Sequence, residues 1–238
     1  MRVVILQPGY LPWLGFFDQL YRSDVFVLYD DVQFDKHGWR NRNRIKTPSG
    51  PHWLTVPVRT RGLGSQPINR ISIDTRSGWS RKHLTALRVN YARAPFVDAY
   101  LGAFEALYAR PWERLLDLNL ATLELLAGAL GLRRRVVLSS TLGIPGQRSE
   151  RLLRICQALG ARTYLTGDAA ESYLDRDLFE AQRITLEFHR YRHPVYPQLY
   201  GEFVPYLSVV DLLFNVGPNS LAVLASGAAA EVTTCARS

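Results

Sequence analysis

Four cationic side chains occupy every second position of one short segment: Arg40, Arg42, Arg44 and Lys46. In an extended chain all four point to the same side, because successive side chains of a strand alternate between its two faces. Guanidinium groups pair bidentately with phosphate and carboxylate. The row therefore predicts a site for a di- or triphosphate, a sugar nucleotide or a carrier phosphopantetheine, and the interleaved Trp39 and Asn43 are assigned to it. A solvated strand face is the alternative.

A second candidate anion site precedes this row. The apolar run 3–6 predicts a buried strand, and a turn rich in Pro and Gly follows it. A helix is expected from Leu14, where apolar residues recur with helical spacing. A strand, a tight turn and a helix start present backbone N–H groups to an anion. We therefore assign Gln7, Tyr10 and Trp13 of this turn to ligand binding.

Acid–base chemistry is predicted near residue 193. His193 titrates near neutral pH, and Tyr196 follows three residues later, so the two are candidates for a general acid/base pair. Tyr191 aligns with His193 in an extended backbone. Together with Gln198 it is assigned to ligand binding. The alternative is a rigid loop whose prolines hold polar side chains against the backbone.

Asp31 is the third catalytic candidate. The predicted strand 25–29 is followed by Asp30 and then by Asp31. A carboxylate at this position could act as acid or base, or bind Mg²⁺ or a ribose. Because neighbouring side chains of a strand point oppositely, at most one of the two is expected to serve. Capping of a loop or helix is the alternative reading.

Three later positions complete the predicted ligand site. Gly167 ends a predicted strand, where the missing Cβ lets a ligand approach closely. Asp211 and Asn215 lie four residues apart on an apolar helix and so share one face. A buried aspartate needs a partner, and an arginine is expected to supply it. No zinc, P-loop or dinucleotide motif is present, so no metal ligands are assigned, and Cys156 is expected to be a core thiol.

The elements that must position these side chains alternate between strands and helices. This alternation predicts an α/β, Rossmann-like, mainly parallel sheet. Strands are expected at 2–6, 25–29, 135–138, 163–165 and 184–188, and helices at 14–22, 150–159, 177–182 and 207–214. An inserted hairpin is expected to pair 52–58 with 70–74. A helical insertion at about 79–131 is expected to contain helices 80–91, 96–109 and 111–130, with Pro111 in a first turn. Beyond the insertion, Ser149 is expected to cap the helix 150–159.

The chain has 238 residues, which predicts one domain over 1–227 and a flexible tail over 228–238. Its net charge is +8, so a nucleic-acid partner is kept open, although a small molecule is favoured. Two cysteines indicate a reducing compartment. The first apolar run is too short for a signal peptide, and no segment reaches the roughly 18 apolar residues of a membrane span. A cytoplasmic location is expected; the oligomeric state is left open.

Several separated motifs occur in a fixed order along the chain: Gln7-Pro8, 11–17, Asp30-Asp31-Val32-Gln33-Phe34, 39–46, Leu165-Thr166-Gly167 with Tyr173-Leu174, 191–198 and 203–218. This order resembles the WbqC-like protein family over about residues 2–224. The resemblance implies a member of a sugar-polymer or natural-product pathway, described as a transferase or tailoring enzyme. The family often shows His-Gln-Pro at the first motif, whereas this chain has Leu6-Gln7-Pro8, so any chemistry of that histidine is missing here.

A more distant similarity concerns architecture alone. The order of strand, turn, helix and strand is similar to the nucleotidylyltransferase superfamily. Those enzymes carry a His-x-Gly-His turn where this chain has Pro12-Trp13-Leu14-Gly15. The resemblance therefore implies a shared fold without the residues of nucleotidyl transfer.

These observations predict a biosynthetic tailoring enzyme, a transferase of an acyl, aminoacyl or sugar-related group. Its substrate would be a phosphorylated, nucleotide-linked or carrier-linked small molecule, with a carrier protein as a candidate partner and Mg²⁺ as a candidate cofactor. His193 or Tyr196 would move the proton during attack on the activated group. Two alternatives stay open, a nucleic-acid-binding module and a non-catalytic scaffold of a biosynthetic complex.

Overall fold

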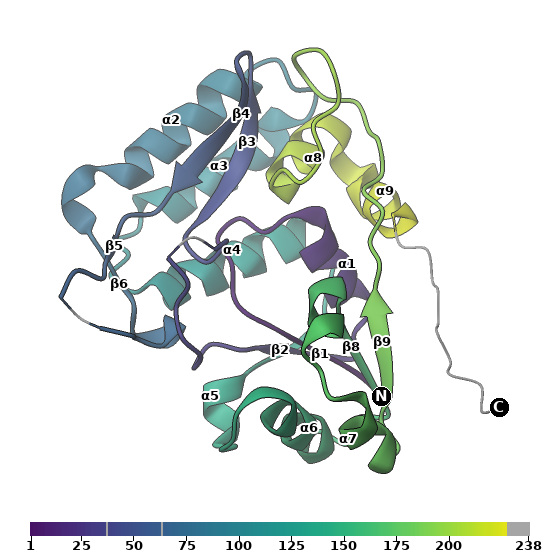
Figure 1. The fold of residues 1–238 in the computed structure, drawn as a ribbon. Coiled ribbons are helices and arrows are strands. Elements are labelled where there is room, and N and C mark those ends of the chain that lie inside the picture. The colour runs from purple at the N-terminus through teal and green to yellow at the C-terminus, as the bar shows by residue number, and fades with distance from the viewer. Residues whose placement is uncertain (37, 63, 228–238) are drawn as a thin grey trace.

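The computed structural model describes residues 1–36, 38–62 and 64–227, and its centre is a parallel sheet of five strands. Their spatial order is β7 (Arg135–Leu138), β2 (Val25–Leu28), β1 (Arg2–Leu6), β8 (Thr163–Gly167) and β9 (Thr185–His189). Every neighbouring pair is parallel. The chain builds outward from β1 to β7 and then returns to the other side of β1. The Rossmann-like prediction is confirmed, and the strand order reverses between β1 and β8 (Figure 1).

Helices cover both faces of this sheet because its strands are apolar on both sides. Val3 and Ile5 pack in one core cluster with α6 (Arg148–Ala158) and α7 (Arg176–Ala181). Val4 packs on the opposite face with α1 (Leu14–Arg22), α4 (Leu115–Ala129) and α9 (Ser220–Ser226). The alternation of side chains along β1 thus sorts neighbouring residues into two separate cores.

The remaining elements lie above the sheet in Figure 1, and they belong to the same core cluster as Val4. They are β3 (Arg42–Thr47), β4 (Gly50–Thr55), β5 (Val58–Arg59), β6 (Ser72–Ile73), α2 (Trp79–Tyr91), α3 (Val97–Ala109) and α8 (Val209–Val216). Ile45 of β3 and Leu54 of β4 face this core. The hairpin and the helical insertion are therefore packed onto the sheet. The assignment of 1–227 to one domain stays a prediction.

The predicted pairing of 52–58 with 70–74 is wrong for most of its length. β4 pairs with β3 in an antiparallel hairpin, with Thr47 opposite Gly50 at the turn. Only β5 pairs with β6. The physical reason is Pro57, which has no N–H to donate and lies between β4 and β5, so the apolar run is divided into two strands with different partners.

Two predicted helix starts are also wrong. The helix predicted from Pro111 begins at Leu115, because the Leu115 N–H donates to the carbonyl of Ile71 (3.0 Å) and fixes an extended segment before it. Ser149 does not cap α6 but lies inside it, where its hydroxyl accepts the N–H of Asp175. Short helical elements absent from the sequence-based assignment are α5 (Ser139–Leu142), Ile68–Arg70, Thr75–Ser77, Asp168–Ser172 and Gly217–Asn219.

The segment Val209–Ser226 is long and apolar enough to cross a membrane by length and composition alone, and 56% of it is buried inside the fold. The short turn Gly217–Asn219 divides it into α8 and α9, and Leu212, Leu213 and Phe214 are fully buried in the core. A core helix passes the same test, so this segment is weak evidence for a membrane span. The predicted flexible tail, 228–238, lies outside the described residues.

Candidate functional site

A pocket of about 910 Å³ opens at the carboxyl ends of the central strands. Leu6 and Gln7 come from the end of β1, Tyr29 follows β2, and Thr166 and Gly167 end β8. Open parallel sheets bind ligands outside the carboxyl ends of their strands, where the strand order reverses. The pocket lies at that position, so we call it the switch-point pocket. Gln7 and Gly167 were predicted from the sequence, and Tyr29 and Thr166 were not.

Arg40 contributes a largely buried cation to this pocket. Its guanidinium donates to the backbone carbonyl of Gln7 (3.3 Å), while its buried Nε has no hydrogen-bond partner among the described residues. Burial lowers the pKa of Arg40 to about 10, and the nearby carboxylate of Asp35 acts in the opposite direction. The side chain is therefore still charged at neutral pH. A charge held away from water gains from a nearby counter-charge.

Arg148 brings a second cation, which the sequence-based assignment missed. It is the first residue of α6 and has a φ of 49°, a left-handed conformation that is unfavourable for a residue with a Cβ. Arg148 and Leu152 line the pocket one helical turn apart, so the first turn of α6 faces it. The N-cap, Gln147, makes no side-chain capping bond. The unpaired N–H groups of a helix start favour an anion.

Three tyrosines make the other side of the pocket aromatic: Tyr29, Tyr164 and Tyr173. Burial raises the pKa of each above its ordinary value. At neutral pH these hydroxyls therefore carry their protons and act as hydrogen-bond donors rather than as bases. The described lining residues include two arginines and no Asp, Glu, His or Cys. The arrangement suits an anionic ligand with an apolar or ring-containing part.

The predicted arginine row divides among three environments. Arg40 reaches the switch-point pocket, whereas Arg42 and Arg44 lie over tryptophan rings on the outer face of β3. Lys46 is buried, and its ammonium donates to the carbonyl of Glu202 (2.5 Å). The row is extended from Arg42 onward, as expected. Its members do not meet at one ligand because the segment 190–207 covers the far end of the strand.

Asn43 and Tyr10 point into the interior rather than into the pocket. The Asn43 amide donates to the carbonyl of Leu11 (2.6 Å). The hydroxyl of Tyr10 lies 2.8 Å from Nδ1 of His83 and 2.5 Å from the hydroxyl of Tyr108, in a fully buried network. Both contacts fix the turn after β1 against the hairpin and the helical insertion. Their positions support a structural role for these two predicted ligand residues.

Asp31 and Asp30 both bind Ser139 at the start of α5. The Ser139 hydroxyl oxygen lies 2.6 Å from Oδ1 of Asp31 and 3.0 Å from Oδ1 of Asp30, so its single hydrogen is shared between the two carboxylates. Arg151 forms a 2.5 Å ion pair with Asp31. Burial alone would raise the pKa of Asp31, but the hydrogen bonds from Arg151 and Ser139 hold it below its usual range. Asp30 also accepts the N–H of Ser140 (3.0 Å), which favours the capping alternative for this carboxylate.

His193 belongs to an aromatic cluster beside the turn after β1. Its ring stacks on those of Trp13 (6.4 Å between centroids) and Tyr196 (6.1 Å), and Tyr191 contacts both Trp13 and His193. Nδ1 of His193 lies 3.0 Å from the carbonyl of Pro194, while its buried Nε2 has no partner among the described residues. Burial lowers the pKa of His193. None of these side chains lines the switch-point pocket.

Asp211 lies behind this cluster and is fully buried. The expectation of an arginine partner is wrong, because Tyr91 donates to Oδ2 at 2.7 Å and the cation that acts on the carboxylate is Lys46. Burial raises the pKa of Asp211 to about 6. Tyr196 also acts on this pKa, although within the described part of the chain neither its hydroxyl nor Oδ1 of Asp211 has a partner in hydrogen-bond geometry.

Two further predicted ligand residues make local contacts. Gln198 makes two hydrogen bonds with the backbone of Val204 and so closes the loop between them. The amide of Asn215 donates to the carbonyl of Asp211 within α8 (2.7 Å). Cys156 is a core thiol whose pKa burial raises to about 12. Among the described residues, no three His, Cys, Asp or Glu side chains come together as a metal site.

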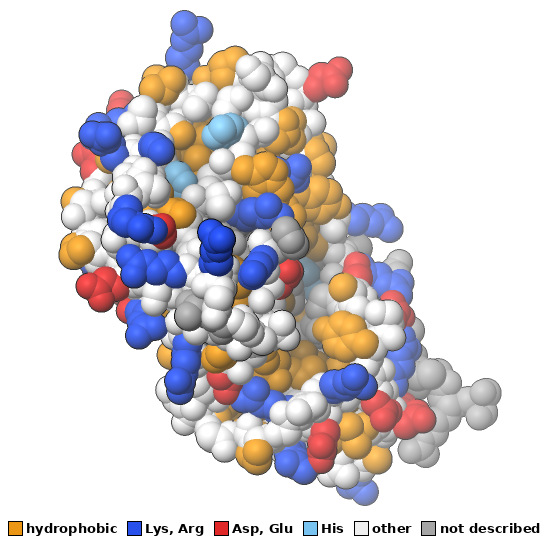
Figure 2. Space-filling view, turned by 60° about the vertical axis from the view of Figure 1, so that its left-hand side comes forward, with side chains coloured by type: hydrophobic (Ala, Val, Ile, Leu, Met, Phe, Trp, Pro, Cys, Tyr) orange, Lys and Arg blue, Asp and Glu red, His pale blue; other side chains and the backbone are white. Residues whose placement is uncertain are grey.

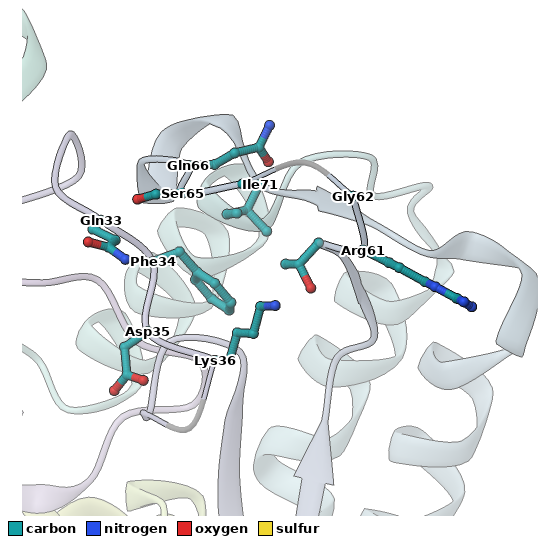
Figure 3. A pocket seen from close by; sticks show the side chains of 11 residues that line it. Gln33, Phe34, Asp35, Lys36, Arg61, Gly62, Ser65, Gln66 and Ile71 are labelled. Atoms are coloured by element: carbon teal, nitrogen blue, oxygen red, sulfur yellow. The ribbon is translucent and has the colours of Figure 1, made fainter.

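A second pocket of about 820 Å³ is lined by residues of the loops 33–36 and 60–66 and by Ile71. Figure 3 shows Phe34 and Lys36 pointing toward Ile71, while Asp35 and Arg61 point away from each other. The charged groups therefore do not converge on one point. We place the candidate site at the switch-point pocket, where two cations and three strand ends meet.

The fold and this site define an α/β protein of Rossmann-like topology with a cationic pocket at its strand-order reversal. The chain matches the model of the WbqC-like protein family over residues 7–223, and it belongs to that family. It is 37% identical over 218 residues to "Uncharacterized protein Rv1507c" of Mycobacterium tuberculosis, covering 91% of this chain and 94% of that protein. No solved structure matches. The family suggests a function in a biosynthetic pathway.

Proposed function

We propose that this chain is a biosynthetic tailoring transferase that binds its anionic substrate in the switch-point pocket. The substrate would be a phosphorylated, nucleotide-linked or carrier-linked small molecule, and the group transferred an acyl, aminoacyl or sugar-related group. The observation that carries this proposal is Arg40, a largely buried cation at the end of β1 that lines the pocket with no carboxylate among the described lining residues. A phosphate or carboxylate in the pocket would pair with its guanidinium group.

The electrostatics of the pocket support an anion over a neutral or cationic ligand. Arg40 and Arg148 line it without a carboxylate among the described lining residues. The first turn of α6 adds the positive end of a helix dipole. The protonated hydroxyls of Tyr29 and Tyr173 can donate to the same oxygens. Preorganised donors of this kind stabilise negative charge without reorganising during a reaction.

His193 is the group in the predicted site best suited to accept a proton. The carbonyl of Pro194 can only accept, so Nδ1 of His193 carries the ring hydrogen and Nε2 carries the lone pair. The lowered pKa keeps the ring neutral at pH 7. In the proposed reaction, Nε2, once uncovered, takes the proton of the attacking nucleophile while the nucleophile bonds to the transferred group. The bond between that group and its phosphate, nucleotide or carrier sulfur breaks at the same time, and the leaving group departs with the electron pair. The reacting end of the substrate would have to reach past Trp13, which stacks on this ring.

The test is ligand-dependent thermal unfolding of wild type, Arg40→Gln and a control, Arg133→Gln, which changes the same charge on an exposed side chain. The probes are nucleoside diphosphates, sugar nucleotides and phosphopantetheine. A ligand at about 100 times its dissociation constant stabilises the native state by about 2.7 kcal/mol. We expect one class to raise the midpoint of wild type and of the control but not of Arg40→Gln. Equal shifts in all three proteins would contradict the proposal.

A further inference from the structure

Two tryptophans and two arginines form an exposed cluster on the outer face of the hairpin, which we call the Trp–Arg surface: Trp39, Arg42, Arg44 and Trp53. Trp39 and Trp53 keep 39% and 40% of their surface exposed, and their ring centroids are 5.1 Å apart. Large aromatic side chains that contact each other in the open are enriched where another molecule binds. The cluster is outside the switch-point pocket and is not used by the proposed reaction.

The indole rings hold the guanidinium groups in place. Cζ of Arg42 lies 4.5 Å from the centroid of Trp53, and Cζ of Arg44 lies 5.7 Å from both Trp39 and Trp53. Arg44 also donates to the carbonyl of Tyr206 (3.2 Å). A surface arginine normally loses side-chain entropy when it binds, and ordering it beforehand reduces that loss. These stacked arginines are thus prepared to bind carboxylate or phosphate groups.

The Trp–Arg surface and the switch-point pocket share one loop. Trp39 is on the surface and its chain neighbour Arg40 lines the pocket. The loop is held on both sides, since the carbonyl of Trp39 accepts the N–H of Tyr10 (3.2 Å) and the carbonyl of Arg40 accepts the amide of Asn119 (2.9 Å). A molecule bound on the surface therefore contacts a residue whose chain neighbour lines the pocket.

We infer that the Trp–Arg surface docks an acidic carrier protein, whose phosphopantetheine arm delivers the substrate to the switch-point pocket. This inference rests on the proposed function. Charge complementarity supports it, because the surface presents the guanidinium groups of Arg42 and Arg44 and the chain carries a net charge of +8. Lys and Arg side chains are also prominent on the face of the molecule shown in Figure 2. A protein partner is favoured over single-stranded nucleic acid, since the rings on which bases would stack already contact Arg42, Arg44 and each other.

The test measures binding of purified acidic acyl and peptidyl carrier proteins, in apo and phosphopantetheine-bearing forms, to the full chain. Quenching of tryptophan fluorescence and calorimetry give the dissociation constants. We expect Trp53→Ala and the double variant Arg42→Gln/Arg44→Gln to weaken binding about tenfold or more. The matched control, Arg133→Gln/Arg135→Gln, removes the same charge from exposed positions elsewhere and should bind like wild type. Unchanged thermal midpoints confirm that each variant is folded.

Absence of binding by every carrier, or equal weakening in the control, would overturn the inference. Tighter, variant-sensitive binding of a single-stranded oligonucleotide would also overturn it and assign the surface to nucleic acid. Arg40→Gln separates the two proposals, because it should abolish small-molecule binding in the pocket and leave docking of an apo carrier intact. If a carrier docks but no ligand binds the pocket, the docking surface is supported and the transferase proposal is rejected. If a ligand binds the pocket but no carrier docks, the transferase proposal is supported and the docking surface is rejected.

Discussion

The guanidinium of Arg40 donates a hydrogen bond to the backbone carbonyl of Gln7, and this contact joins the end of β1 to the loop before β3. The contact uses the main chain of Gln7, so it does not depend on that side chain. Gln7 also lines the pocket, and we assign its side-chain amide to the proposed ligand. The backbone of Gln7 thus makes a structural contact, whereas its side chain is proposed to contact the ligand.

Replacing Gln7 by alanine should lower ligand affinity without unfolding the protein. The Arg40 contact survives in Gln7→Ala, so the free energy of unfolding should change by less than about 0.5 kcal/mol. One lost neutral hydrogen bond should weaken binding of the phosphate-bearing ligand by a few-fold, about 0.5–1.5 kcal/mol. Titration calorimetry and urea unfolding measure the two quantities. A large loss of stability would show that the side chain has a structural partner.

Replacing Asp31 by asparagine should affect stability more than catalysis. The substitution breaks the ion pair with Arg151 and leaves that guanidinium against a partly buried amide. We expect a loss of about 1–2 kcal/mol in urea unfolding and an unchanged ligand-induced thermal shift. Arg151→Gln should cost a similar amount, and the double variant less than the sum of the two. If Asp31→Asn keeps its stability but loses pathway product, the predicted catalytic role is supported.

Asp211 should make stability fall as the pH rises from about 4 to about 6. Burial raises its pKa to about 6 in the folded protein, whereas an unfolded aspartate titrates near ~3.9. Between these values the folded state keeps a proton that the unfolded state releases, so the stabilising contribution is complete below ~3.9 and is lost as the pH passes 6. Asp211→Asn should therefore gain about 2 kcal/mol relative to wild type between pH 4 and pH 7.

Urea unfolding across this pH range checks the prediction for Asp211. Asp177→Asn, at an exposed position in the first turn of α7, provides the control and should follow the wild-type profile. Parallel profiles for wild type and Asp211→Asn would show that the carboxyl does not titrate near pH 6.

Gly217 should not tolerate a side chain. It ends α8 with a φ of 63° and a ψ of −131°, a region that only glycine adopts readily, and an added Cβ would lie 2.4 Å from Cδ1 of Phe96. We expect Gly217→Ala to cost at least about 1–3 kcal/mol from strain alone. Gly102→Ala is the matched control: its Cβ meets nothing within 4 Å inside α3, so it should stabilise the helix by about 0.5–1 kcal/mol. Thermal unfolding compares the two.

Local sequence signals predicted the sheet well because β1, β2 and β7 contain short apolar runs and β9 alternates apolar with polar residues. β1 and α1 begin and end where the pattern placed them. The partner of β4 could not be predicted in the same way, because strand pairing depends on a neighbour elsewhere in the chain and Pro57 interrupts the run. The family membership was predicted from the order of motifs and is confirmed over residues 7–223.

The pocket was only partly predictable. Gln7 and Gly167 end strands of a parallel sheet, and that position alone marks them as candidates. Arg148 carries no local signal, and Tyr173 stood only in the family motif Tyr173-Leu174. Both enter the pocket only when α6 and the segment after β8 fold against the sheet. The spacing predicted four cations on one side of a strand, but it contained no information on the segment 190–207. The carbonyl of Glu202 in that segment binds the Lys46 ammonium, so Lys46 is not available to a ligand of the arginine row.

The buried ammonium of Lys46 has a consequence for how the molecule moves. It donates to the carbonyl of Glu202, so the covering segment holds a charge that would otherwise face the interior. If only one or two residues of that segment moved away, the ammonium would lose its carbonyl partner without becoming fully hydrated. That state has a higher free energy than one in which the ammonium is fully exposed to water. We therefore expect hydrogen exchange in this segment to occur through one cooperative opening that admits water to Lys46, and not by progressive fraying.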